Sequence, residues 1–248
     1  MRNMLVLLLL GAFMSSCNSD STPRNQEMSP AGDGQGGSLA TFTLKGDYLY
    51  VVDENDLNVF IINNLLEPVF INKVGVGFGI ETLFGYKDYL YIGSTTGMFI
   101  YSLDNPEFPK LLSSVDHFTA CDPVVANDSH AFVTLHSDTF CGNDINLLEI
   151  YDVTDVRNPI LVSSRNLIHP KGLGLYGNYL IVCDDQIKIF DVSVPSKSKF
   201  VKAIDRQAFD VIINGNLLIA IGETGLYQYR LDSSSDEITH TFLSSIDI

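Results

Sequence analysis

The sequence predicts an all-β fold, a five-bladed β-propeller with four antiparallel strands in each blade. Two kinds of apolar run alternate along the chain, each kind occurs five times, and short turn sequences separate them. No segment beyond the N-terminal region has a helical period, so strands are expected throughout. One four-stranded sheet cannot cover both of its faces. Repeats of about 40 residues are therefore expected to stack on their neighbours around an axis.

The first kind of run is the expected second strand of each repeat. It begins at Tyr48, Tyr89, His130, Tyr179 and Leu217, so that successive starts differ by 41, 41, 49 and 38 residues. A tight-turn dipeptide precedes these runs, as Gly46-Asp47 and Gly215-Asn216 illustrate. Such dipeptides suit the short connection of a β-hairpin. A first strand is therefore expected just before each turn.

The second kind of run is the expected third strand, and its fourth position is always aromatic. These residues are Phe60, Tyr101, Tyr151, Phe190 and Tyr229. We expect them to fill equivalent packing sites between neighbouring repeats, with stacking on a ligand as the alternative. A fourth strand follows each run, so every repeat keeps its own four strands. Closure between the first and fifth repeats would then rest on side-chain packing, and the alternative is that the repeat boundaries lie one strand away from those assigned.

The first sixteen residues have the shape of a lipoprotein signal peptide. Arg2 opens a short polar start, an apolar run follows from Leu5 to Phe13, and small Ser15 and Ser16 precede Cys17. This ending resembles the bacterial lipobox, in which the cysteine is lipidated and becomes the mature N-terminus. The alternative is an ordinary secreted protein that is cut nearby.

The remaining chain divides into a tether and a folded domain. Residues 17–37 comprise the lipidated cysteine and a flexible polar tether, and residues 38–248 form the propeller. The formal net charge is −15, which disfavours nucleic acid as a partner. No later apolar run reaches the about 20 residues that span a bilayer as a helix. The expected membrane attachment is the N-terminal lipid, and no cofactor is expected.

Two motifs indicate a family. "LYVVD" and "LIVCD", with the following "IYDVTDVRNPILVSS" and "IFDVSVPSKSKFV", resemble the LVIVD-repeat family of secreted and lipid-anchored bacterial proteins. The resemblance covers residues 38–248 and implies a propeller in the cell envelope. Together with the lipobox it leads us to expect an outer-membrane lipoprotein that faces the periplasm or the surface. It implies no reaction. Ser94 and Gly222 stand where the motif has Asp.

The third repeat carries an insertion within residues 136–146 that contains Cys141, and Cys121 precedes the first strand of the same repeat. Loops at these two positions open at the same end of a propeller, so the cysteines can meet. In an oxidising envelope we expect a disulfide. The alternative is a metal site that uses His117, Cys121, His136 and Cys141. Cys183, within an apolar strand, is expected to be buried.

The same end of the ring is the candidate binding face, because it collects the loops that lead into the blades and those between second and third strands. Its candidate residues are Phe78, His117, Phe118, His136, His169, Lys171, Arg206, Gln207 and Glu223. For each residue the alternative is a solvated loop side chain. No motif of a hydrolase, metalloprotease or phosphate-binding loop is present, so no catalytic residue is assigned.

These observations favour a lipid-anchored envelope propeller that is a non-catalytic binding module for a protein or small molecule. A propeller hydrolase or lyase that acts on extracellular glycans is the alternative. A structural subunit of an outer-membrane assembly is a third possibility, and it would require a large exposed apolar patch.

Overall fold

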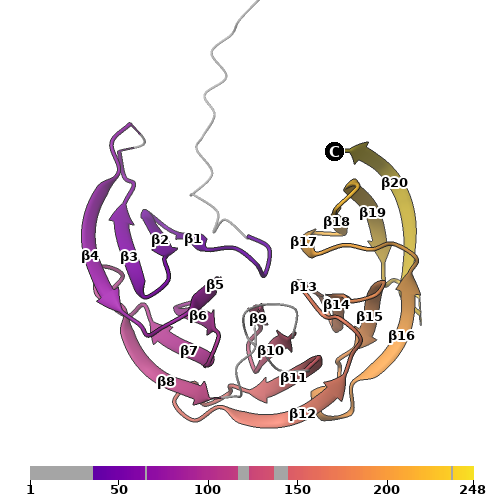
Figure 1. Ribbon diagram of the computed structural model, residues 1–248, viewed down its shortest axis with the longest axis horizontal. Helices are drawn as coiled ribbons and strands as arrows, with labels where there is room; N and C mark the ends of the chain where they lie inside the picture. The colour runs from indigo at the N-terminus through magenta and orange to yellow at the C-terminus, as the bar shows by residue number, and fades with distance from the viewer. Residues whose placement is uncertain (1–35, 65, 117–122, 137–144, 236) are drawn as a thin grey trace, which may run out of the picture. The chain divides into compact units, whose positions relative to one another are not determined.

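The computed structural model describes residues 36–64, 66–116, 123–136, 145–235 and 237–248. Within them the chain forms five antiparallel sheets of four consecutive strands each, and this confirms the predicted fold class. Figure 1 shows the sheets side by side around an arc, with first strands toward the centre and fourth strands outside. No described helix is long and apolar enough to cross a membrane.

The strand bounds follow the repeats. Sheet one contains β1 (Phe42–Lys45), β2 (Tyr48–Val52), β3 (Asp56–Ile61) and β4 (Val69–Gly75). Sheet two contains β5 (Ile80–Tyr86), β6 (Tyr89–Ser94), β7 (Gly97–Ser102) and β8 (Lys110–Asp116). Sheet three contains β9 (Val124–Ala126), β10 (His130–Leu135), β11 (Leu147–Asp152) and β12 (Ile160–Asn166). Sheet four contains β13 (Leu173–Tyr176), β14 (Tyr179–Cys183), β15 (Ile187–Asp191) and β16 (Lys199–Ile204), with a 3₁₀ turn η1 (Pro195–Lys197). Sheet five contains β17 (Asp210–Asn214), β18 (Leu217–Gly222), β19 (Gly225–Asp232) and β20 (Thr239–Asp247).

Two local devices recur in the sheets. The first residue of the first hairpin turn has a positive φ in four sheets, with Gly46 at 55° and Lys87 at 50° as examples. Turns of this kind match the right-handed twist of the flanking strands. In all five sheets the pairing of the third and fourth strands shifts register just before the repeated aromatic residue, as between Val59 and Phe60. The extra residue belongs to the fourth strand, as Ile71 does in sheet one, so the bulge bends the outer strand opposite the aromatic residue.

The repeated aromatic residue packs on the preceding sheet. Tyr101 of sheet two lies in one apolar cluster with Tyr50 and Leu57 of sheet one. Tyr101, Tyr151, Phe190 and Tyr229 are all 5% exposed or less. The expected packing role is therefore confirmed for sheets two to five. Cys183 is also fully buried, as predicted.

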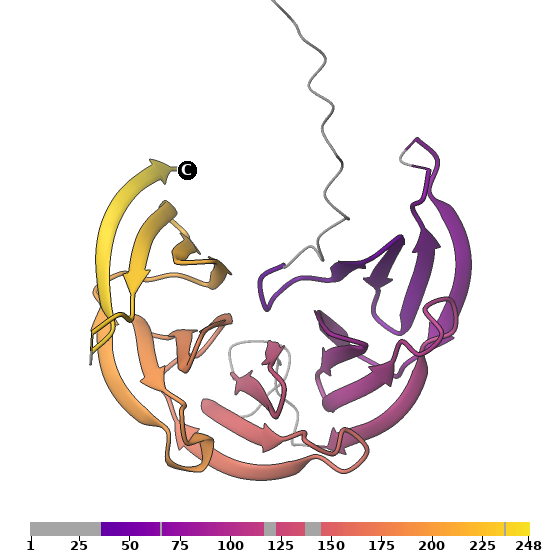
Figure 2. The ribbon, with the colours of Figure 1, turned by 180° about the vertical axis from the view of Figure 1, so that it is seen from behind.

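Among the described residues no sheet precedes sheet one, and none of them covers its flank on that side. Phe60, at the repeated aromatic position, is half-buried, whereas Tyr101 is 2% exposed. Phe42 is 55% exposed, whereas Leu83, at the same register position of sheet two, is 1% exposed. Figure 2 shows sheet one at one end of the arc, with the sector beside it open.

Sheet five ends the arc with a second uncovered flank. Ile212 is 36% exposed, and Ile219 is half-buried. On this flank the polar residue Gln228 pairs with Ile219. At the same register position of sheet one, Val59 pairs with Tyr50, and both of these residues are fully buried. Substantial contacts join each sheet to the next, and among the described residues none of comparable extent joins sheet five to sheet one. Sheet packing between the first and fifth repeats, which the sequence led us to expect, therefore does not close the arc.

The segment Gly36–Ala40, which we call the axial segment, links the sheets at the centre instead. The Leu173 N–H of sheet four donates to Ser38 Oγ at 2.7 Å, and Ser38 Oγ donates to Asp210 of sheet five at 3.1 Å. The Leu83 N–H of sheet two donates to the Ala40 carbonyl at 2.7 Å. Ser38 is only 1% exposed, so these hydrogen bonds are shielded from water. The hydrogen bond between Ser38 and Asp210 thus links the axial segment, which leads into sheet one, to sheet five.

Candidate functional site

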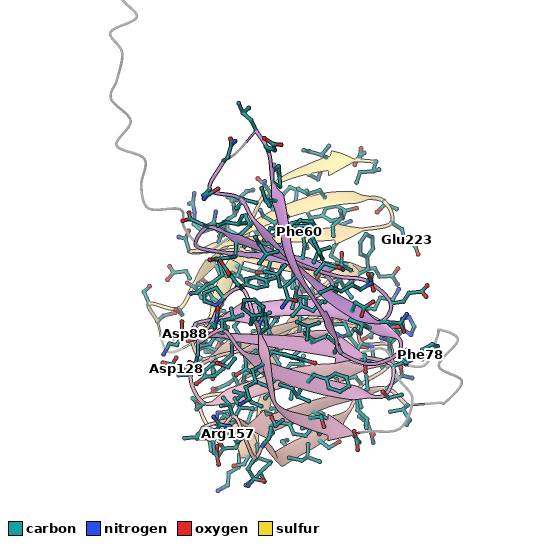
Figure 3. All side chains as sticks on the ribbon, turned by 90° about the vertical axis from the view of Figure 1, so that its left-hand side faces the viewer. Phe60, Phe78, Asp88, Asp128, Arg157 and Glu223 are labelled. Carbon is teal, nitrogen blue, oxygen red and sulfur yellow. The ribbon has the colours of Figure 1, made fainter. Side chains whose placement is uncertain are left out.

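The arc has two faces. The loops that lead into the sheets lie on one face, together with the loops between second and third strands. Figure 3 shows Phe78 and Glu223 on this face, and Asp88, Asp128 and Arg157 on the opposite face. We call the first face the binding face. The second is the hairpin face, because it carries the turns between first and second strands. The two kinds of loop therefore share one face, as the sequence predicted.

Four candidate residues line one pocket on the binding face, which we call the polar pocket. His169 and Lys171 precede β13, Gln207 precedes β17, and Glu223 follows β18. The pocket lies between sheets four and five and has a volume of about 290 Å³. Its other lining residues are Asp184, Asp185, Ala208, Phe209 and Thr224.

Three further candidates lie outside the polar pocket. Arg206 lines an adjacent open depression that also includes Gln207, and its guanidinium lies 4.3 Å from the ring centre of Tyr227. His136 is buried, with its ring centre 6.0 Å from that of His169. Phe78 is 76% exposed and lines neither hollow.

The remaining predicted site residues cannot be placed. Cys17, His117, Phe118, Cys121 and Cys141 lie outside the described residues. The disulfide between Cys121 and Cys141 and the lipidation of Cys17 therefore stay predictions. Of the alternative metal set only His136 is described, and the described part of the chain contains no cluster of three metal-ligating side chains.

Asp184 fixes one wall of the polar pocket. Its side chain is fully buried and accepts hydrogen bonds from the backbone N–H groups of Ile168, at 3.1 Å, and His169. Lys188 Nζ lies 2.7 Å from Asp184 and 2.6 Å from Asp185. Burial alone would raise the pKa of Asp184, but the Lys188 ammonium and the two backbone donors outweigh it and lower that pKa. The carboxylate therefore anchors the loop that carries His169.

Sequence reasoning missed Asp184, Asp185 and Thr224 as pocket residues. Asp184 is the last residue of the "LIVCD" motif, and at the same motif position Asp53 accepts hydrogen bonds from the Asn55 and Asp56 amides of its own hairpin. The motif therefore suggested a turn residue. The available signal was Lys188 after the acidic pair Asp184-Asp185, because the first repeat has Asn58 at that position after its own acidic pair Asp53-Glu54.

The polar pocket offers hydrogen-bond donors and acceptors of both charges at close quarters. Lys171 contributes a cation, Glu223 a carboxylate, and Gln207 an amide that both donates and accepts. A ligand rich in hydroxyl or amide groups could pair with this set, whereas a purely apolar ligand would leave it unsatisfied.

No protein-family model matches the sequence, and no curated protein matches it either. Solved structures do match. A periplasmic gluconolactonase of Pseudomonas aeruginosa is 14% identical with a TM-score of 0.63, and the match covers 82% of this chain and 68% of that one. A protein from Lactobacillus plantarum is 14% identical with a TM-score of 0.60, covering 81% and 68%. Hsv2p of Kluyveromyces lactis is 12% identical with a TM-score of 0.53, and the chain spans 61% of its length. At these identities the likeness shows the fold alone: the chain is a distant structural match to β-propellers of the seven-bladed type.

Proposed function

We propose that this protein is a lipid-anchored propeller of the bacterial cell envelope that binds a small polar ligand in the polar pocket. The observation that carries the binding role is the convergence of His169, Lys171, Gln207 and Glu223, from loops of two sheets, on one pocket of about 290 Å³. Rigid sheets hold these loops, and that arrangement favours a preformed site.

The chemistry of the lining narrows the ligand class. A ligand with several hydroxyl or amide groups can pair with Gln207 and Thr224 and remain close to the opposite charges of Lys171 and Glu223. Sugars, sugar acids and short peptides are ligands of this kind. Lys188 pairs with both Asp184 and Asp185, so these two carboxylates form the wall of the pocket rather than contact the ligand.

The proposed location rests on the sequence. A short apolar run ends at Ser15-Ser16-Cys17, and a polar tether follows. The resemblance of "LYVVD" and "LIVCD" to LVIVD repeats supports the same assignment. A tether of about 20 flexible residues spans on the order of 25 Å, which would hold the propeller close to the membrane surface.

Hydrolysis is the second candidate function. His169 and Glu223 line the same pocket, and a titratable pair of this kind can act as acid and base toward a bound ester or glycoside. The match to a gluconolactonase makes a sugar lactone the first substrate to try.

Binding is tested by ligand-observed NMR and calorimetric titration of the chain from residue 18 onward. The probes are gluconate, glucono-lactone, an N-acetylated disaccharide and a dipeptide. At least one probe is expected to bind, and Gln207→Ala and Glu223→Ala are each expected to weaken it by about tenfold. Glu237→Ala, an exposed carboxylate after β19, is the matched control and should change nothing. Absence of binding at millimolar concentration, or unchanged binding in both variants, would contradict the proposal.

The lactone titration also separates binding from hydrolysis. Acid release from glucono-lactone above the spontaneous rate, lost in Glu223→Ala, would favour the enzyme, whereas saturable binding without acid release favours the module. Anchoring is tested separately by membrane fractionation and intact mass measurement of the native protein and of Cys17→Ser. Release of the variant from the membrane with loss of the lipid mass is the expected result, and a membrane-bound variant would exclude the anchor.

A further inference from the structure

The polar pocket contains two opposite charges that do not pair with each other. Lys171, just before β13, contributes an ammonium group, and Glu223, in the turn after β18, contributes a carboxylate. Within the described part of the chain no ion pair includes either side chain, and the ion pairs in the pocket wall are those of Lys188. Both charges are therefore available to a ligand in the same pocket.

Backbone hydrogen bonds hold Lys171 in place from three sides. Its N–H donates to the Cys183 carbonyl of sheet four at 2.7 Å, and its carbonyl accepts from the Thr134 hydroxyl of sheet three at 2.5 Å. The N–H of the next residue, Gly172, donates to the Phe209 carbonyl, just before sheet five, at 2.9 Å. The site of the cation is thus fixed before a ligand arrives, which lowers the entropic cost of binding.

The opposite wall depends on a departure from the repeat motif. Glu223 and Thr224 form the tight turn between β18 and β19, because Gly222 pairs with Gly225. Gly222 stands where the motif has aspartate, and a Cβ at this position would lie 2.5 Å from the carbonyl oxygen of Gln207. Only a glycine permits this approach. The loss of the aspartate therefore brings the loop that carries Gln207 against the turn that carries Glu223.

Charge and size together define the ligand class. A ligand carboxylate can pair with the Lys171 ammonium, and a ligand ammonium can pair with the Glu223 carboxylate. The formal net charge of −15 repels a ligand that is only anionic, whereas a zwitterion carries no net charge. The volume of about 290 Å³ is roughly twice the 150 Å³ that accommodates one benzene ring, so it suits about twelve non-hydrogen atoms.

We propose that the polar pocket binds a free amino acid or a dipeptide as its zwitterion, with Lys171 on the carboxylate and Glu223 on the ammonium group. The Gln207 amide can pair with a polar side chain or a peptide group of the ligand. This inference rests on the proposed binding role of the pocket and narrows its ligand class.

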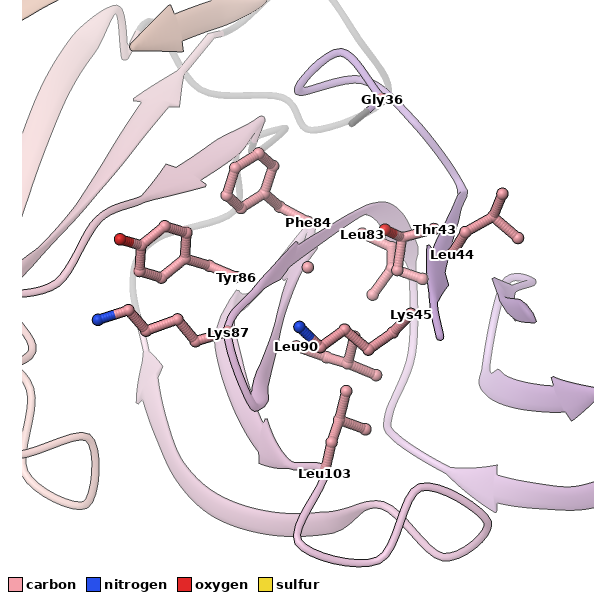
Figure 4. A pocket seen from close by; sticks show the side chains of 11 residues that line it. Gly36, Thr43, Leu44, Lys45, Leu83, Phe84, Tyr86, Lys87, Leu90 and Leu103 are labelled. Carbon is pink, nitrogen blue, oxygen red and sulfur yellow. The ribbon is translucent and has the colours of Figure 1, made fainter. Parts of the chain in front are cut away.

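A pocket between β1 and β5 provides an internal comparison. Figure 4 shows its lining, which is mostly apolar and whose charged residues are Lys45 and Lys87. No described carboxylate belongs to this lining, and Lys87 pairs with Asp128 outside it. A ligand ammonium group would find no counter-charge there. Zwitterion binding is therefore expected at the polar pocket.

Calorimetric titration of the protein with blocked ligands tests the two charges separately. The probes are L-glutamine and glycyl-L-glutamine, each also in its N-acetyl form and as its C-terminal amide. At pH 6.5 the free α-amino groups are largely protonated. At least one zwitterion is expected to bind, and to bind about tenfold more tightly than either of its blocked forms.

Two variants assign each charge to one end of the ligand. Lys171→Met should weaken binding of the zwitterion about tenfold without weakening binding of its amide, which has no carboxylate. Glu223→Gln should weaken binding of the zwitterion by a similar factor without weakening binding of its N-acetyl form, which has no ammonium group. Lys110→Met, on the outer strand β8, is the control and should change no affinity. Far-UV circular dichroism verifies that the variants are folded.

Three results would overturn the inference: no binding of either zwitterion at millimolar concentration, equal affinity for a zwitterion and its blocked forms, or unchanged zwitterion affinity in both variants. The sugar probes separate this inference from the binding role on which it rests. If gluconate or the N-acetylated disaccharide binds and neither zwitterion does, the inference fails and the binding role stands. If none of these probes binds, both fail.

Discussion

Sheet two packs on sheet one with the same positions of the repeat that sheet one presents on its outer flank. The side chains at these positions are buried in sheet two and partly exposed in sheet one. Leu90 of β6 is fully buried against sheet one, whereas Leu49, its counterpart in β2, is half-buried. Tyr101 and Phe60 differ in the same way. A repeat therefore specifies which side chains point toward the preceding sheet, and only the position of the repeat in the arc decides whether they are buried.

The largest effect on the free energy of unfolding is expected when Leu90→Ala is compared with Leu49→Ala. Leu90→Ala removes fully packed methyl groups and leaves a cavity, so it should lower the free energy of unfolding by about 2–5 kcal/mol. Leu49→Ala removes partly hydrated surface and should cost about 1 kcal/mol. Urea titration of both variants measures the difference. Equal losses would show that another surface covers the flank of sheet one in solution.

The axial segment is the next region to compare, because it bridges the two ends that the sheets leave apart. Ser38→Ala removes the hydroxyl shared by Leu173 and Asp210, and with both groups left unpaired we expect a loss of about 1–3 kcal/mol. Ser234→Ala, on an exposed loop, is the control and should be neutral. Hydrogen exchange at the Leu173 amide should accelerate in Ser38→Ala only. Unchanged exchange would show that the segment does not hold this amide in solution.

The stability contributions of the half-buried Asp210 and the buried Asp184 should change with pH in opposite directions. Burial raises the pKa of Asp210, against the hydrogen bonds from Ser38 and nearby backbone amides, so the stability that this group contributes is present at low pH and is lost as pH rises through its folded pKa. The pKa of Asp184 is lowered, so its contribution is present above its unfolded pKa of about 3.9 and is lost as pH falls through the folded value.

Asp210→Asn and Asp184→Asn isolate these contributions when urea titrations are made from pH 3 to pH 8. The stability advantage of the wild type over Asp210→Asn should grow as pH falls, and its advantage over Asp184→Asn should shrink. Slopes of the same sign in the two series would disprove the opposite pKa shifts of the two carboxyls.

The smallest expected effect concerns the exposed link between sheets two and three on the hairpin face. Asp128 pairs with Lys87 and accepts a hydrogen bond from Tyr86, and the Asp128 and Lys87 side chains are 68% and 58% exposed. Solvent and salt screen such a pair. Asp128→Asn should therefore leave the denaturation midpoint unchanged within error at moderate salt. A clear loss would mean that this surface pair contributes like a buried interface.

Several features of the fold could be predicted because they are local. The tight turns at Gly46 and Gly215 depend on backbone preference, and the five repeated aromatic residues depend on alternation along one strand. The grouping of His169, Lys171, Gln207 and Glu223 at one end also follows from topology, since every repeat threads its strands in the same order.

Other features were out of reach of pattern analysis. Asp184 has the motif position of a turn residue, yet it anchors the loop carrying His169, because its partners come from a segment more than ten residues away in sequence. Thr43 lies so close to Gly85 of the neighbouring sheet that a Cβ there would be 3.0 Å from Thr43 Oγ1, and neither residue by itself suggests this contact. Such features require knowing which side chains meet across an interface.

By itself the sequence determined the number of repeats, the strands within each, the inward and outward side chains and the end at which the loops gather. These follow from short-range backbone preferences and from an alternation of period two. The tertiary structure decided that the five sheets leave two flanks uncovered among the described residues, that Ser38 and Asp210 meet at the centre, and that Asp184 anchors the loop carrying His169. The curvature of the stack sets these distances, and it arises from the packing of whole sheets rather than from any one repeat.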